Sequence, residues 1–117
     1  MTQEERKQEF QSIYFNDLGL CGCGRPEDIQ KLLYLLLDNH NKHKLKQITY
    51  DEKEEILNKI LKETDPDVLF EFIFHILDNG GLLEHGGSIY GSWFTDKGKR
   101  FLDYLSDQEL LDNVNSI

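Results

Sequence analysis

The sequence predicts a mainly α-helical domain with a small β-hairpin and an N-terminal helical extension. Three observations favour this fold class. Leucine and isoleucine recur at three- and four-residue spacing, the period of an amphipathic helix, in several segments of the 117 residues. Proline stands at the start of two such segments, and a Gly-Gly pair stands at the end of the second of them. In the last third, two short apolar runs flank a second glycine pair, as expected for the strands of a hairpin.

Four helices are predicted before the hairpin, over about residues 3–15, 26–39, 50–63 and 66–78. Thr2 and Glu5 form a capping box at the start of the first helix. Pro26 suits the first position of the second helix, and Asp65-Pro66 provides a cap and a first residue for the fourth. The fourth helix is apolar on nearly all sides, which is typical of a helix that is buried or lies in an interface.

Strands are predicted at three places. Leu45–Thr49 alternates polar and apolar residues and is expected to be a short strand. Leu82–His85 and Ile89–Phe94 are expected to form the hairpin. Thr95 or Asp96 then caps a fifth helix.

A short turn and a tail are predicted at the C-terminus. Ser106 and Glu109 cap one short turn, and the tail beyond Asp112 is expected to fray. The chain therefore divides into an N-terminal helix with a Gly/Cys loop, a central domain, and a short turn and tail, at residues 1–25, 26–105 and 106–117.

Composition limits the class of protein. Hydrophobic residues make up 38% and charged residues 30% of the chain, as in a small globular domain with one core. The apolar run Leu32–Leu37 is too short to span a bilayer. The N-terminal ten residues are charged and contain no apolar signal segment, so we expect a cytoplasmic protein with no membrane partner.

The charge balance disfavours nucleic acid as a partner. The net charge is −9 at pH 7, and residues 64–117 hold three basic against ten acidic residues. Affinity for nucleic acid comes largely from neutralising phosphates, which an acidic chain does poorly. The clearest local basic stripe is Lys42, Lys44 and Lys46.

Two segments resemble a known family. They are ILDNGGLLEH at residues 76–85 and WFTDKGKRFLDYL at residues 93–105. The first is similar to the exit from the recognition helix, and the second to the returning wing strand and following helix, of the winged-helix domain of bacterial transcription regulators. The resemblance implies a winged-helix-like domain over residues 26–105. A looser resemblance is to small uncharacterised bacteriophage proteins that pair a CGCG loop with an EHGGS-like wing.

In that family, the helix before the wing uses basic and amide side chains to contact the major groove of DNA. The matching segment here, residues 66–78, contains no lysine, arginine, asparagine or glutamine. The wing, residues 85–92, contains no arginine that could enter a minor groove. We therefore expect the scaffold to serve a purpose other than DNA recognition.

The sharpest chemical hypothesis is a structural zinc site. Cys21 and Cys23, followed by His40 and His43, offer two thiolates and two imidazoles, a donor set that suits tetrahedral zinc. A helix of about 14 residues and about 20 Å separates the two pairs, so the loops must fold back for them to share an ion. The alternative is that both cysteines are small buried residues in a tight glycine turn. A reactive thiolate and a phosphate cradle at the same loop are weaker hypotheses.

Five residues are predicted to contact a partner: Asp67, Glu71, His85, Tyr90 and Trp93. Tyr90 and Trp93 point to opposite faces of a regular strand, so one is expected in the core and the other is a possible interaction anchor. The leading prediction is a non-enzymatic, acidic protein–protein interaction module without a cofactor, such as a small phage or bacterial adaptor or inhibitor. A winged-helix DNA-binding transcription regulator and a DNA mimic stay open as alternatives. A homodimer through residues 1–15 or 66–78 is a related hypothesis.

Overall fold

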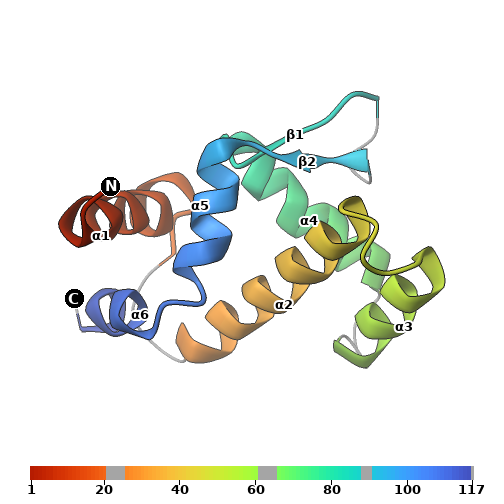
Figure 1. The fold of residues 1–117 in the computed structure, drawn as a ribbon, viewed down its shortest axis with the longest axis horizontal. Helices are drawn as coiled ribbons and strands as arrows, with labels where there is room; N and C mark the ends of the chain where they lie inside the picture. The colour runs from red at the N-terminus through yellow and green to blue at the C-terminus, as the bar shows by residue number, and fades with distance from the viewer. Residues whose placement is uncertain (21–25, 61–65, 88–90, 117) are drawn as a thin grey trace.

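The computed structural model describes residues 1–20, 26–60, 66–87 and 91–116. Across these residues the chain is mainly helical with a two-stranded antiparallel sheet, so the predicted fold class is confirmed (Figure 1). The elements in chain order are the helix α1 (Gln3–Gln11), the π-helix η1 (Ser12–Asp17), the helices α2 (Pro26–Lys44), α3 (Tyr50–Ile60) and α4 (Pro66–Asn79), the strands β1 (Leu83–Glu84) and β2 (Trp93–Phe94), and the helices α5 (Asp96–Tyr104) and α6 (Gln108–Asn115).

The elements are arranged around α2, which crosses most of the molecule (Figure 1). At one end, α1 and α6 lie side by side, and both chain termini lie there too. Toward the other end, α3 and the hairpin each contact α2. Because α5 contacts α1, α2 and β2, it connects the terminal helices to the hairpin.

Local capping explains where α1 and α3 begin. The Thr2 hydroxyl accepts a hydrogen bond from the Glu5 backbone N–H, and the Glu5 carboxylate accepts one from the Thr2 N–H. Thr49 and Glu52 form the same reciprocal pair before α3. Each pair satisfies two backbone donors that the first turn of a helix leaves open. The starts of both helices are therefore encoded within four residues.

Thr95 and Gly98 fix α5 against the end of α4. The Thr95 hydroxyl donates to the Gly81 carbonyl at 2.8 Å and accepts from the Gly98 N–H at 3.0 Å. The Thr95 N–H donates to the Leu82 carbonyl at 3.1 Å. A Cβ atom at Gly98 would overlap that same carbonyl oxygen, so this position requires glycine. The Thr-x-x-Gly pattern thus closes the hairpin and starts the next helix at one place.

The predicted strand at Leu45–Thr49 is wrong. α2 continues through Lys44, beyond its predicted end at residue 39, and residues 45–48 form a turn. Lys46 takes a φ of 60° in this turn, which ends the helix in the left-handed region. The helix continues because His40, one turn after Leu36, extends the buried face of α2.

The predicted frayed tail beyond Asp112 is also wrong, since that segment belongs to α6. Asp107, rather than Ser106, is the N-cap of α6, and its carboxylate accepts from two backbone N–H groups of the first turn. Leu110 and Val114 are fully buried by contact with the rest of the molecule. α6 is therefore part of the core.

Two further elements differ in extent from the prediction. The first helix ends at Gln11 and continues as the π-helix η1 to Asp17. In the hairpin, Leu83 lies opposite Phe94 and Glu84 opposite Trp93, so its paired part is shorter than predicted; residues 88–90 lie outside the described residues.

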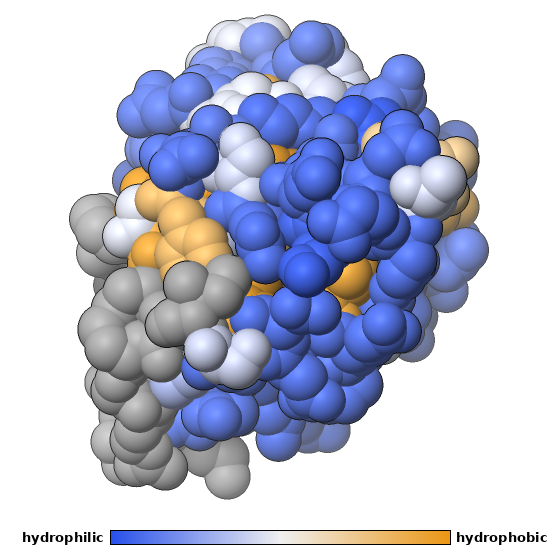
Figure 2. All heavy atoms as spheres, turned by 90° about the vertical axis from the view of Figure 1, so that its left-hand side faces the viewer, coloured by the Kyte–Doolittle hydropathy of each residue, from blue (hydrophilic) through white to orange (hydrophobic). Residues whose placement is uncertain are grey.

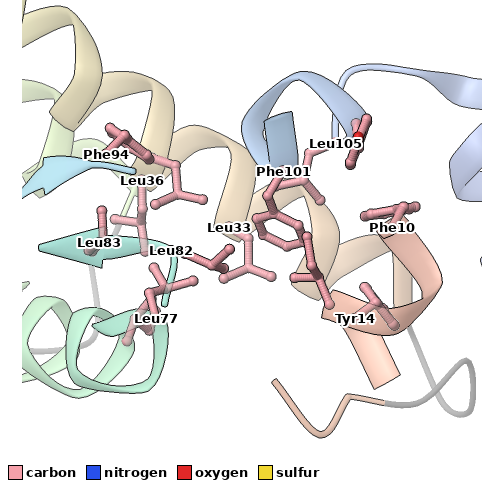
Figure 3. Packing of buried hydrophobic residues seen from close by; sticks show 14 of the residues in the cluster. Phe10, Tyr14, Leu33, Leu36, Leu77, Leu82, Leu83, Phe94, Phe101 and Leu105 are labelled. Atoms are coloured by element: carbon pink, nitrogen blue, oxygen red, sulfur yellow. The ribbon is translucent and has the colours of Figure 1, made fainter. Parts of the chain in front are cut away.

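The hydrophobic core runs continuously from α1 to the hairpin (Figure 3). At the α1 end, Phe10 packs against Tyr14, Phe101 and Tyr104, with ring centroids 5.7 to 5.8 Å apart. Toward the hairpin, the core consists mainly of aliphatic side chains from α2, the end of α4 and β1, namely Leu33, Leu36, Leu37, Leu77, Leu82 and Leu83. These contacts place the base of the hairpin directly on α2.

The face formed by the terminal helices is mainly hydrophilic (Figure 2). This view looks at the side of the molecule where α1 and α6 lie. Three apolar residues of the first segment, Phe10, Ile13 and Tyr14, are fully buried inside the chain, whereas Met1 is exposed and Phe15 is half-buried. A homodimer through residues 1–15 stays a prediction.

Candidate interaction surface

The outer face of the hairpin exposes Trp93, a residue that is 46% accessible to solvent. The next residue, Phe94, is buried, as the alternation of a strand requires. The Trp93 Nε1–H donates to the Glu84 carboxylate at 3.2 Å, and the two residues are directly opposite in the ladder. Tyr90, the other predicted anchor, lies outside the described residues. The hairpin thus presents an aromatic ring held by a carboxylate.

His85 connects the hairpin to the end of α4. Its Nδ1–H donates to the Gly86 carbonyl at 2.9 Å, and its Nε2 lies 3.4 Å from the Asp78 carboxylate. The imidazole is half-buried. The predicted interaction residue His85 therefore has a local role in orienting the hairpin.

The described half of α4 is amphipathic, although the sequence predicts an apolar helix on nearly all sides. Glu71, His75 and Asn79 are exposed at successive turns. The opposite face is buried and consists of Ile73, Phe74 and Leu77. The side chain of Asp67 lies outside the described residues. Along its described exposed face, α4 therefore offers a carboxylate, an imidazole and an amide, and no cation.

His40, predicted as a metal ligand, is fully buried near the end of α2. Its Nε2 lies 2.8 Å from the Ser92 carbonyl, which only accepts, so Nε2 carries the proton. Its Nδ1 then accepts from the Lys53 ammonium at 3.3 Å. The ring stands edge-on to Phe74, with centroids 4.8 Å apart. Burial lowers the pKa of His40 to about 4, so the imidazole is neutral at pH 7.

Lys53 is a buried lysine on α3. Burial lowers its pKa, and the neighbouring Glu54 carboxylate opposes that change. Its backbone carbonyl accepts from the Asn39 side chain at 3.3 Å. Together with the His40–Ser92 hydrogen bond, these contacts link α2, α3 and the residue before β2 by polar groups inside an apolar core. Such a network favours one packing arrangement of the three elements, because any shift leaves buried polar groups unpaired.

His43, the second predicted histidine ligand, is half-buried, and its ring stands edge-on to Tyr50. Burial lowers its pKa, with a smaller contribution from nearby lysines. Cys21 and Cys23 lie outside the described residues, where zinc binding stays a prediction. Within the part of the chain that the structure describes, no three His, Cys, Asp or Glu side chains are grouped to hold a metal ion. Both ring nitrogens of His40 already face groups of the chain itself.

Arginine side chains join the terminal helices to α5. Arg6 bonds the carboxylates of Asp103 at 2.8 Å and Asp107 at 3.0 Å. Arg100 bonds Glu9 at 2.6 Å. The hydrogen bond to Arg100 lowers the pKa of Glu9 and outweighs the opposing effect of burial. The guanidinium groups of Arg6 and Arg100 therefore form ion pairs within the chain.

Several lysines that DNA binding would use also contact acceptors of the chain itself. These pairs are Lys42 with Asp38, Lys44 with the Gly91 carbonyl, and Lys97 with Asp17. Lys46 and Lys99 make no ion pair among the described residues. A DNA phosphate would have to compete with these internal acceptors for the lysine ammonium groups. The affinity of the predicted basic stripe for nucleic acid should therefore be lower than its number of lysines suggests.

Sequence reasoning missed two features of the fold. The first is the buried pair of His40 and Lys53, for which the only signal is that His40 continues the leucine stripe of α2 at helical spacing. The second is an aliphatic pocket between α2 and α4. No local signal could have found it, because its walls come from segments about 40 residues apart in the chain.

Comparison of the chain with protein-family models, with curated proteins and with solved structures found no match. Among the helices within the described residues, none combines the length and the apolar character needed to cross a membrane. The functional proposal therefore depends on the fold and on the residues exposed at its surface.

Proposed function

We propose that the chain is a non-enzymatic, acidic protein–protein interaction module on a winged-helix-like scaffold. The order α2, α3, α4, hairpin and α5 supports the scaffold, whereas the turn at residues 45–48 departs from it, since that family has a short strand there. The observation that carries the function is the hairpin: Trp93 is nearly half-exposed and held by Glu84. Aromatic residues in such positions are common anchors of protein interfaces.

The charges favour a basic protein surface as the partner. The chain has a net charge of −9, and several of its cations are paired internally. The described exposed positions of α4, a helix that contacts β1, carry Glu71 and no cation. Complementary charge speeds the encounter of two proteins and fixes their orientation, while a buried aromatic anchor supplies affinity.

Capture from a bacterial lysate, followed by titration with the purified captured protein, tests this proposal. We expect a Trp93→Ala variant to bind the captured protein at least about tenfold more weakly than the wild type, the usual loss at an aromatic anchor. Tyr50→Ala is the matched control, because Tyr50 is also exposed and aromatic but lies at the start of α3. Equal binding by the Trp93 variant, or salt-sensitive binding of duplex DNA in a gel shift, would contradict the proposal.

A further inference from the structure

A pocket of about 150 Å³ lies between α2, α4 and the segment that follows η1. Every described residue that lines it is leucine or isoleucine. Two helices supply opposite walls at the spacing of one helix face: α2 through Ile29 and Leu32, and α4 through Ile73 and Ile76. The pocket is thus built from two apolar stripes that face each other across a gap.

The inner side of the pocket is formed by core residues, and its outer side is open to solvent. Leu33, Ile73 and Leu77 are buried members of the continuous core, so the floor is held by the fold. Ile29 is 44% exposed, so the wall that it forms meets solvent. Leu18 closes another wall, and a Cβ atom at Gly80 would lie 3.5 Å from it, in ordinary contact. A small molecule could therefore enter without unfolding any helix.

The apolar side chains that line the pocket determine which kind of ligand it can bind. Among the described lining residues no side chain donates or accepts a hydrogen bond, so a water molecule inside could bond only to other water molecules. An enclosed apolar cavity of about this size accepts a benzene molecule or a xenon atom. A charged or hydrogen-bonding ligand would lose its hydration without compensation.

We propose that this pocket is a binding site for a small apolar molecule of alkyl or aromatic type. The volume suits a ligand of roughly six heavy atoms, since benzene occupies a cavity of this size. The site shares no residue with the outer face of the hairpin, so it does not depend on the proposed protein partner.

Titration of the methyl-labelled protein with benzene, followed by carbon–proton NMR correlation spectra, tests the site directly. The expected result is a saturable shift of the methyl signals of Ile29, Leu32 and Ile73, with no shift at Leu45, which is exposed elsewhere. No saturable shift, or equal shifts at Leu45, would overturn the proposal.

Two variants separate binding at this pocket from weak adsorption. Ile29→Asp places a carboxylate on the rim and should weaken benzene binding at least about tenfold, because an apolar ligand cannot replace its hydration. Leu45→Asp is the matched control, since Leu45 is 58% exposed in the turn after α2, and it should bind as the wild type does. Both positions are exposed, so the fold should survive, which circular dichroism checks. Unchanged affinity in the Ile29 variant would refute the site.

Leu32→Phe supplies a second, independent variant. Leu32 is half-buried in the wall, and a phenyl ring there would occupy the space that benzene uses. Benzene binding should be lost while the melting temperature stays at or above that of the wild type, because a filled cavity restores lost contacts. Retained binding would show that the probe lies elsewhere and would overturn the proposal.

Discussion

His40 loses its ordinary affinity for protons when the chain folds. An unfolded chain titrates histidine near pH 6.5, whereas burial holds the pKa of His40 at about 4 in the folded state. Between these pH values the unfolded state binds the proton and the folded state does not, so protons favour unfolding. The contribution of His40 to stability is therefore complete above pH 6.5 and is lost as the pH falls toward 4.

A His40→Gln variant should reveal this effect. Between about pH 7 and about pH 4.5, we expect the wild type to lose roughly 2 to 3 kcal/mol more of its free energy of unfolding than the variant does. Glutamine keeps a donor for the Ser92 carbonyl but does not titrate. Urea unfolding at the two pH values measures the difference, and His75→Gln, on the exposed face of α4, is the control. Parallel curves for His40→Gln and the wild type would refute the argument.

Gly98 offers a second test on a single residue. A methyl group at this position overlaps the Leu82 carbonyl, which itself accepts the N–H of Thr95. We expect Gly98→Ala to destabilise the protein by at least about 2 kcal/mol, since backbone cannot move aside as a flexible side chain does. Gly86→Ala is the matched control, because nothing lies within 4 Å of its Cβ position. Thermal unfolding compares the two, and similar melting temperatures would be the contrary result.

Helix starts were predictable from the sequence because their signals are local. Thr2 and Thr95 cap helices at the expected positions, each with a partner three residues later. Helix ends and the C-terminal helix were less predictable, because they depend on contacts distant in the chain. α2 continues past residue 39 because His40 meets Ser92, and the end of α6 is held by a hydrogen bond from Gln30 to Asn115.

The candidate site, like the helices, was predictable only where its signals are local in the sequence. The sequence predicts Trp93 or Tyr90 as an interaction anchor, and strand alternation around the buried Phe94 explains why Trp93 is exposed. The contact of His85 with Asp78 and the internal pairing of Lys44 needed the fold, since their partners are brought near by the hairpin. The sequence pattern could therefore locate the exposed aromatic residue, but not the hydrogen bonds and ion pairs around it.

α6 is expected to behave as an essential element rather than a tail. Leu110→Ala removes a fully buried side chain and should lower the free energy of unfolding by about 2 to 4 kcal/mol. Glu109→Ala, one residue earlier and exposed, should change it by no more than about half a kcal/mol. Chemical unfolding followed by far-ultraviolet circular dichroism measures both variants. An equal, small effect of the two substitutions would show that α6 is peripheral.

At the scale of the whole molecule, the ion pairs of the terminal helices, the exposed aromatic ring and the aliphatic pocket lie at three separate places. Arg6 and Arg100 join the terminal helices to α5, and the face formed by those helices is mainly hydrophilic (Figure 2). The exposed aromatic ring lies on the hairpin, and the aliphatic pocket lies between α2 and α4. The fold thus has two separate candidate binding sites, the hairpin for a partner protein and the aliphatic pocket for a small apolar ligand.

Trp93 is the chain's single tryptophan, and it stands on the hairpin rather than in the core. Its intrinsic fluorescence therefore reports on the hairpin surface and needs no added label. A protein that covers the hairpin should shift this emission toward the blue, whereas benzene in the aliphatic pocket should leave it unchanged, because Trp93 does not line that pocket. A single optical experiment can thus tell the two occupants apart.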